Sequence, residues 1–119
     1  MKNSFNNRLL SKCKQVNNRL CIGLDIDPDK LPPHISDLKS VEDFTKEIID
    51  STIEFCPVYK PNFAFYERFG SKGFALLENI VQHIGNRAIT IADAKRGDIG
   101  NTSKHYADSI FYQFGFDSI

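Results

Sequence analysis

The sequence predicts an α/β fold built on a parallel sheet, and two observations carry this prediction. Short apolar runs alternate with longer segments of helical periodicity, which is typical of parallel strands joined by crossover helices. The runs are nearly continuous, as in strands that are covered on both faces. They span residues 20–24, 55–59 and 88–92, and each leads at its C-terminal end into a charged residue: Asp25, Lys60 and Asp93.

Helical patterns are expected before and between these strands. The first predicts a docked helix from apolar residues at helical spacing, namely Phe5, Leu9, Cys13, Val16 and Leu20. Ser40 with Asp43 resembles a capping box at the start of the next helix. Another spans about 71–84 before a C-capping Gly85, and a last one spans about 102–114. Residues 116–119 would then open a fourth strand.

The composition is that of an ordinary globular domain, with 41% hydrophobic and 25% charged residues in 119. Lys plus Arg and Asp plus Glu both number 15, which argues against a nucleic-acid or anionic-membrane partner. No apolar run approaches the roughly 18 residues of a membrane span. Residues 1–24 lack acidic side chains, as transit peptides do, but their helical apolar spacing favours a docked helix. Three cysteines without close pairing predict reduced thiols in a cytoplasmic protein.

Candidate catalytic residues gather where the strands end. Asp93 and Lys95 are two positions apart on a strand, so they share a face. Lys60 and Asp25 end the other two strands and are expected to project into the same space, because active sites of parallel α/β barrels form at this edge. Asp98 follows in the loop. A solvated loop with ordinary salt bridges would explain any one of these charges, but their repetition at three strand ends favours a cluster.

Such a cluster has defined chemistry. A lysine between carboxylates keeps its proton, because nearby negative charge raises its pKa. It is therefore a poor Schiff-base nucleophile but a good cation and proton donor. Carboxylates beside it would repel a substrate carboxylate, and the ammonium would stabilise and then protonate the carbanion left behind. The pattern predicts decarboxylation rather than aldolase chemistry through an imine.

The segment 93–99, which reads Asp-Ala-Lys-Arg-Gly-Asp-Ile, resembles the D-x-K-x-x-D-I signature of orotidine 5'-phosphate decarboxylases. The resemblance extends to Leu24-Asp25 and to residues 58–62, and it covers most of the chain from about residue 20. It implies a partial (β/α)8 TIM barrel, with an N-terminal helix, three βα units and the start of strand four in one domain over 1–119. Because a whole barrel needs about 250 residues, we expect a truncated portion without the phosphate-binding loops.

The resemblance also implies a role for each residue in converting orotidine 5'-phosphate to uridine 5'-monophosphate (UMP) in pyrimidine biosynthesis. Asp25 would bind the ribose hydroxyls, and Lys60 would be the first member of a Lys–Asp–Lys–Asp network that also binds substrate. Asp93 would face the substrate carboxylate, and Lys95 would protonate C6. Asp98 would act across a homodimer interface, from which Thr102 would also reach the partner's nucleotide.

No cofactor and no metal are expected. Related barrels that share D-x-K-x-x-D use Mg²⁺ and carry an acidic residue at the position of Lys60, where a cation would oppose a divalent metal. Two alternatives stay open. One is a Mg²⁺-dependent sugar-phosphate decarboxylase or aldolase of the same suprafamily, and the other is a non-catalytic half-barrel remnant.

Overall fold

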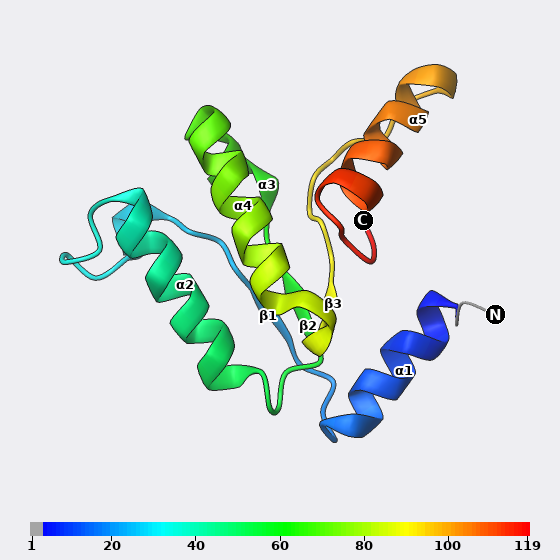
Figure 1. Cartoon of the computed structure of the whole chain (residues 1–119), viewed down its shortest axis with the longest axis horizontal. Coiled ribbons are helices and arrows are strands. Elements are labelled where there is room, and N and C mark those ends of the chain that lie inside the picture. Colours follow the sequence, from blue (N-terminus) through cyan, green and yellow to red (C-terminus); the bar gives the residue numbers. More distant parts are fainter. Residues whose placement is uncertain (1–3) are drawn as a thin grey trace.

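A computed structural model describes residues 4–119 of the chain. Helices and strands alternate along it (Figure 1). The order is α1 (Phe5–Gln15), β1 (Cys21–Gly23), α2 (Leu38–Thr52), β2 (Val58–Lys60), α3 (Phe63–Glu67), α4 (Gly70–Ile84), β3 (Ile89–Thr90) and α5 (Gly100–Ala107), which continues as the π-helical turn η3 (Asp108–Gln113). Short 3₁₀ turns follow β1 and α4: η1 (Pro28–Lys30) and η2 (Gly85–Arg87).

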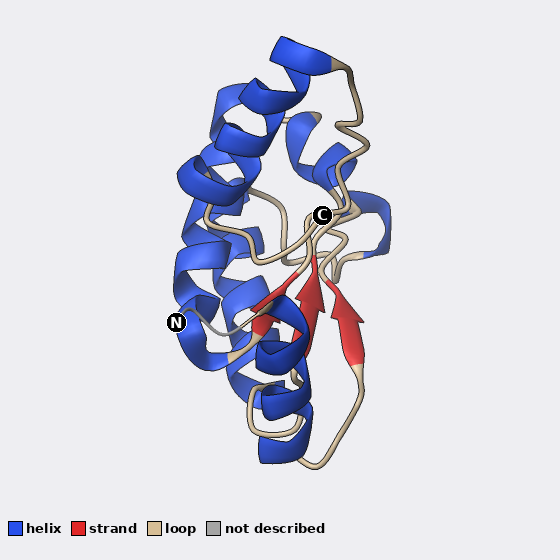
Figure 2. Ribbon diagram, turned by 90° about the vertical axis from the view of Figure 1, so that its right-hand side faces the viewer, coloured by secondary structure: helices blue, strands red, loops and turns tan. Residues whose placement is uncertain are grey.

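The three strands form one parallel sheet in the order β1-β2-β3, with all three pointing the same way (Figure 2). Gly23 pairs with Lys60, and Tyr59 pairs with Thr90. A parallel bridge between Ile91 and Ser118 begins a fourth strand beside β3. The predicted parallel α/β architecture, with the opening of strand four, is therefore confirmed as a partial barrel.

The two faces of the sheet differ in what covers them. Alternate residues along the strands and just beyond their ends, such as Leu24, Tyr59 and Ala92, are buried in the core with apolar residues of α2, α3 and α4. On the opposite face, Cys21, Val58 and Ile91 line a cavity of about 740 Å³. Leu9, Leu10 and Cys13 of α1 line the same cavity. Below, the core-packed face is called the helix face and the other the open face.

Two predicted strands differ from the structure. β1 was expected to be buried on both faces, but Cys21 is exposed because β1 lies at the sheet edge and this residue belongs to the open face. β2 was expected to start at residue 55, whereas it starts at Val58. Phe55 is 45% exposed in the turn that ends α2, and Pro57, which has no N–H, separates that turn from the ladder.

The capping box of α2 was assigned to the wrong pair. The carboxylate of Asp37 accepts from the N–H of Ser40 at 2.7 Å, and the Ser40 hydroxyl accepts from the N–H of Asp37 at 3.1 Å. Asp43 instead accepts a bond from Lys39 at 2.5 Å. Ser40 is thus the third helical residue of the box rather than its N-cap, and the true N-cap, Asp37, lies three residues before the proposed one.

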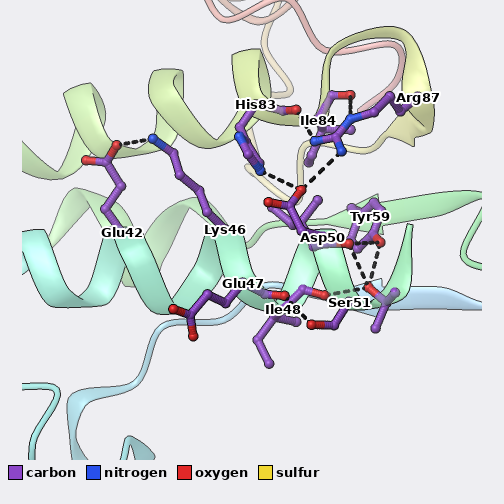
Figure 3. A network of polar contacts seen from close by, with 12 residues as sticks. Glu42, Lys46, Glu47, Ile48, Asp50, Ser51, Tyr59, His83, Ile84 and Arg87 are labelled. Carbon is purple, nitrogen blue, oxygen red and sulfur yellow. Dashed lines mark hydrogen bonds and ion pairs between the residues drawn. The ribbon is translucent and has the colours of Figure 1, made fainter. Parts of the chain in front are cut away.

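A polar network ties α2 to α4 on the outside of the sheet (Figure 3). Asp50 of α2 accepts from Arg87 at 3.1 Å and lies 2.8 Å from Nε2 of His83. The hydroxyl of the buried Tyr59 lies 2.7 Å from the hydroxyl of Thr52. This contact binds β2 to α2 at the residue that precedes Lys60.

Within residues 4–119, no helix is long and apolar enough to cross a membrane.

The short helix α3 was not expected. Its aromatic residues Phe63 and Tyr66 are buried in the core. The Asn62 side chain caps α3 by accepting from the N–H of Ala64 at 3.0 Å. Helix α4 crosses α3 so closely that a Cβ at Gly73 would lie 1.8 Å from the Tyr66 carbonyl oxygen. Glycine at position 73 therefore allows the contact that fixes α3 beside the strand ends.

Candidate active site

The backbone around Asp93 is fixed by an extension of the β2–β3 pairing. Asp93 forms a parallel bridge with Asn62, beyond the last residues of both strands. Its N–H donates to the Pro61 carbonyl at 3.1 Å, and its carbonyl accepts from the N–H of Phe63 at 2.9 Å. Because Asp93 lies one residue from the buried Ala92 and Ala94, its side chain belongs to the open face.

Asp93 lies between two ammonium groups. Nζ of Lys60, the last residue of β2, donates to Oδ2 of Asp93 at 3.1 Å. Nζ of Lys95 lies 3.7 Å from Oδ1 of the same carboxylate. Each carboxylate oxygen thus faces one cation. The structure brings together these three of the candidate residues, and we call them the charged cluster.

Asp25 lies at the end of β1 on the same face. It follows Leu24, whose N–H donates to the Lys60 carbonyl at 3.3 Å, and its own side chain is exposed. A Cβ placed on Gly23, the pairing partner of Lys60, would lie 3.8 Å from Oδ1 of Asp25. The Asp25 carboxylate is therefore directed along the open face, next to the strand that carries Lys60.

The charges of the cluster reinforce one another. The hydrogen bond to Asp93 raises the pKa of Lys60 above its ordinary value against the lowering effect of desolvation, and the charges of Asp93 and Asp25 add to the rise. The hydrogen bond from Lys60 lowers the pKa of Asp93 against the raising effect of desolvation, with help from the charges of Lys60 and Lys95. Both groups are therefore ionised at neutral pH.

Lys95 has an unusual backbone. Its φ is 49°, in the left-handed region that non-glycine residues rarely adopt. Its side chain is 85% exposed, and with residues of α5 it lines a cavity of about 430 Å³. Strain of this kind is stored at functional sites and is maintained by neighbouring contacts.

Arg96 supplies those contacts, and sequence reasoning gave it no role. Its guanidinium donates to the Ala94 carbonyl at 2.6 Å and pairs with Glu67 of α3 at 3.2 Å. It also lies over the rings of Phe63 and Tyr106, 5.5 and 5.9 Å from their centroids. Arg96 thus binds the loop that carries Lys95 to both flanking helices. Its place inside the 93–99 motif was the signal available in the sequence.

The remaining candidates stand apart from the cluster. Asp98 is exposed in the loop before α5, where Oδ1 accepts from the N–H of Ile99 at 2.8 Å. Thr102 is exposed in the first turn of α5. Within the described residues 4–119, no hydrogen bond or ion pair joins either side chain to Lys60, Asp93 or Lys95.

The paired ionisation of Lys60 and Asp93 gives a testable pH dependence. Because the folded pKa of Asp93 is lowered, its contribution to stability is present above the unfolded pKa and is lost as pH falls through the folded one. Because the folded pKa of Lys60 is raised, its contribution is present below the unfolded pKa and is lost as pH rises through the folded one. The substitution Lys60→Met should therefore lower the free energy of unfolding most near neutral pH.

The expected cost is roughly 1 kcal/mol or less, because the two side chains are 36% and 32% exposed and solvent screens the pair. The measurement is the free energy of unfolding of the unaltered chain and of the Lys60→Met variant from pH 3 to 11. A difference that persists unchanged at pH 3 would contradict the electrostatic origin. Lys72→Met, an exposed lysine on α4, is the control.

Comparison with known proteins gives a consistent picture. Residues 18–119 match the model of the family described as "Orotidine 5'-phosphate decarboxylase / HUMPS family". The chain is 49% identical over 104 residues to the orotidine 5'-phosphate decarboxylase of Christiangramia forsetii, covering 84% of this chain and 38% of that protein. It is 44% identical over 115 residues to the one of Bacteroides fragilis strain YCH46, covering 93% and 42%.

Solved structures agree. A putative orotidine-monophosphate-decarboxylase from Toxoplasma gondii superposes with a TM-score of 0.88 at 38% identity, over 98% of this chain and 39% of that one. The UMP synthase of Leishmania donovani superposes with a TM-score of 0.80 at 34% identity, over 95% and 23%. The chain thus spans about 40% of the length of the curated relatives.

Proposed function

Because this chain belongs to the orotidine 5'-phosphate decarboxylase / HUMPS family, we propose that its charged cluster is the catalytic centre of an orotidine 5'-phosphate decarboxylase. The observation that carries the proposal is the Asp93 carboxylate between Nζ of Lys60 at 3.1 Å and Nζ of Lys95 at 3.7 Å. The reaction releases CO₂ from orotidine 5'-phosphate and yields UMP without a cofactor.

The steps follow from the charges. The substrate carboxylate is placed against the ionised Asp93, and repulsion between the two anions is relieved when CO₂ leaves. The C6–carboxylate bond breaks and its electron pair stays on C6. The Lys95 ammonium stabilises this carbanion and then transfers its proton to C6. Water restores the proton to Lys95, while Lys60 keeps Asp93 ionised throughout.

Substrate binding falls to the polar residues around the cluster. Asp25 accepts from the ribose hydroxyls, a role that its exposed position on the open face supports. Lys60 contributes its positive charge beside the same sugar. Asp98 and Thr102 act in a homodimer, each reaching the nucleotide of the partner subunit. Their exposure and their separation from the charged cluster of their own chain support this assignment.

The direct test uses a completed barrel, meaning this chain joined to the C-terminal portion of the Bacteroides fragilis relative, of which the chain covers 42%. Orotidine 5'-phosphate should be converted to UMP by the completed barrel but not at a comparable rate by the 119-residue chain alone. A completed barrel that folds, binds UMP and leaves the substrate carboxylate in place would refute the proposal.

The completed barrel should also be indifferent to metal removal. The ammonium of Lys60 stands where Mg²⁺-dependent relatives carry an acid, and it opposes a divalent cation. Adding a chelator should therefore leave kcat and KM unchanged. Inhibition that added Mg²⁺ reverses would favour a sugar-phosphate enzyme of the metal-dependent type.

A further inference from the structure

The carbonyl group of Leu24 is satisfied in an unusual way. Leu24 follows β1, is 5% exposed, and directly precedes Asp25. Its carbonyl oxygen accepts a hydrogen bond from the hydroxyl of Tyr66 at 2.7 Å. Tyr66 lies in α3, 42 positions further along the chain, and is fully buried. A buried side chain on the helix face thus holds the backbone that presents Asp25 on the open face.

The need for this bond comes from the end of the strand ladder. The N–H of Leu24 donates to the Lys60 carbonyl, so the parallel pattern would next require the N–H of Asn62 to reach the Leu24 carbonyl. The chain turns into α3 at Asn62, however, and within residues 4–119 no backbone N–H donates to that carbonyl. Without Tyr66 the carbonyl would be buried and unpaired, which is costly.

Tyr66 itself has little freedom to move. Its carbonyl packs against Gly73 of α4, where a Cβ would lie 1.8 Å away. The N–H of Phe69 donates to the same carbonyl at 3.0 Å. Burial and the charge of Asp25 raise the pKa of the Tyr66 hydroxyl, so it stays protonated and remains a donor at every physiological pH. The hydrogen bond is therefore a fixed link between α3 and the end of β1.

We infer that Tyr66 is a positioning residue for nucleotide binding, which fixes the Asp25 carboxylate at the ribose by holding the Leu24 carbonyl. The inference rests on the proposed function for the identity of the nucleotide, but the structural link can be tested without it. Within residues 4–119, the Tyr66 hydroxyl bonds to the Leu24 carbonyl and makes no hydrogen bond with the charged cluster. It acts only through the segment Leu24-Asp25.

The first experiment measures amide hydrogen exchange on the full 119-residue chain. Tyr66→Phe should speed exchange of the Leu24 N–H, which bonds to Lys60, by roughly tenfold or more relative to amides of the α4 core. Tyr59→Phe is the matched control, since it removes the hydroxyl of the other buried tyrosine, which bonds α2 instead. Equal acceleration at Leu24 and throughout α4 would overturn the inference, because it would mean general destabilisation.

The second experiment is a double-mutant cycle in the completed barrel. Tyr66→Phe should raise KM for orotidine 5'-phosphate by roughly tenfold with a smaller change in kcat, and this effect should vanish in an Asp25→Ala background. A Tyr66→Phe effect of the same size with and without Asp25 would overturn the inference. Absence of turnover with Tyr66 and Asp25 both present would instead sink the proposed function, and the exchange experiment would still decide the inference.

Discussion

Replacing Lys95 by alanine in the completed barrel is expected to lower kcat for decarboxylation by about 10³-fold or more. The substitution removes both the cation that stabilises the carbanion and the proton donor to C6, two contributions that each reach orders of magnitude in enzymes. Stability should change little, because the Lys95 side chain is 85% exposed. The measurement is the loss of substrate absorbance under single-turnover conditions, with circular dichroism to verify the fold.

Lys72→Ala on α4 is the matched control, since Lys72 is exposed and, within residues 4–119, makes no hydrogen bond or ion pair with the charged cluster, so kcat should be unchanged. Turnover of Lys95→Ala near that of the control would show that the proton comes from another group. A loss of UMP affinity with kcat unchanged would instead assign Lys95 to ground-state binding.

The second large effect concerns Asp98. Asp98→Ala should lower activity by about 10²-fold or more, because a carboxylate at the substrate is lost, yet mixing this variant with Lys95→Ala should restore activity. If Asp98 acts on the partner's nucleotide, a mixed dimer has one doubly altered site and one intact site. Random exchange makes half the dimers mixed, so recovery should approach about a quarter of the unaltered activity.

The same mixture distinguishes the opposite arrangement. If Asp98 served the site of its own subunit, every site in the mixture would carry one lesion and no activity would return. Size-exclusion chromatography should accompany the assay, because recovery requires that subunits exchange. A Thr102→Ala variant mixed with Lys95→Ala should follow the behaviour of Asp98, with a smaller initial loss.

The sequence was sufficient for features that depend on local pattern. The apolar runs and helical periodicities placed every strand of the sheet to within a few residues, and the charged residues after those runs identified the edge where Lys60 and Asp93 meet. Asp93 and Lys95 were also expected on one side, and their charges do lie 3.7 Å apart, although the left-handed backbone of Lys95 departs from the strand geometry on which that expectation rested.

Features that depend on tertiary contacts could not be predicted from the sequence. The hydrogen bond from Tyr66 to Leu24 joins residues 42 positions apart. It is needed because the β1–β2 pairing ends before the N–H of Asn62 can bond to the Leu24 carbonyl. The left-handed backbone of Lys95 depends on the guanidinium of Arg96 against α3 and α5. Cys21 was misjudged because a continuous apolar run indicates burial within a sheet but does not show which strand lies at the edge of that sheet.

A crystal structure of the completed barrel with bound UMP tests the central claim most directly. The claim predicts the pyrimidine on the open face of the sheet, with C6 directed at Nζ of Lys95, the ribose hydroxyls on Asp25, and Lys60 still bonded to Asp93. A nucleotide bound elsewhere, or one whose C6 points away from the charged cluster, would contradict it.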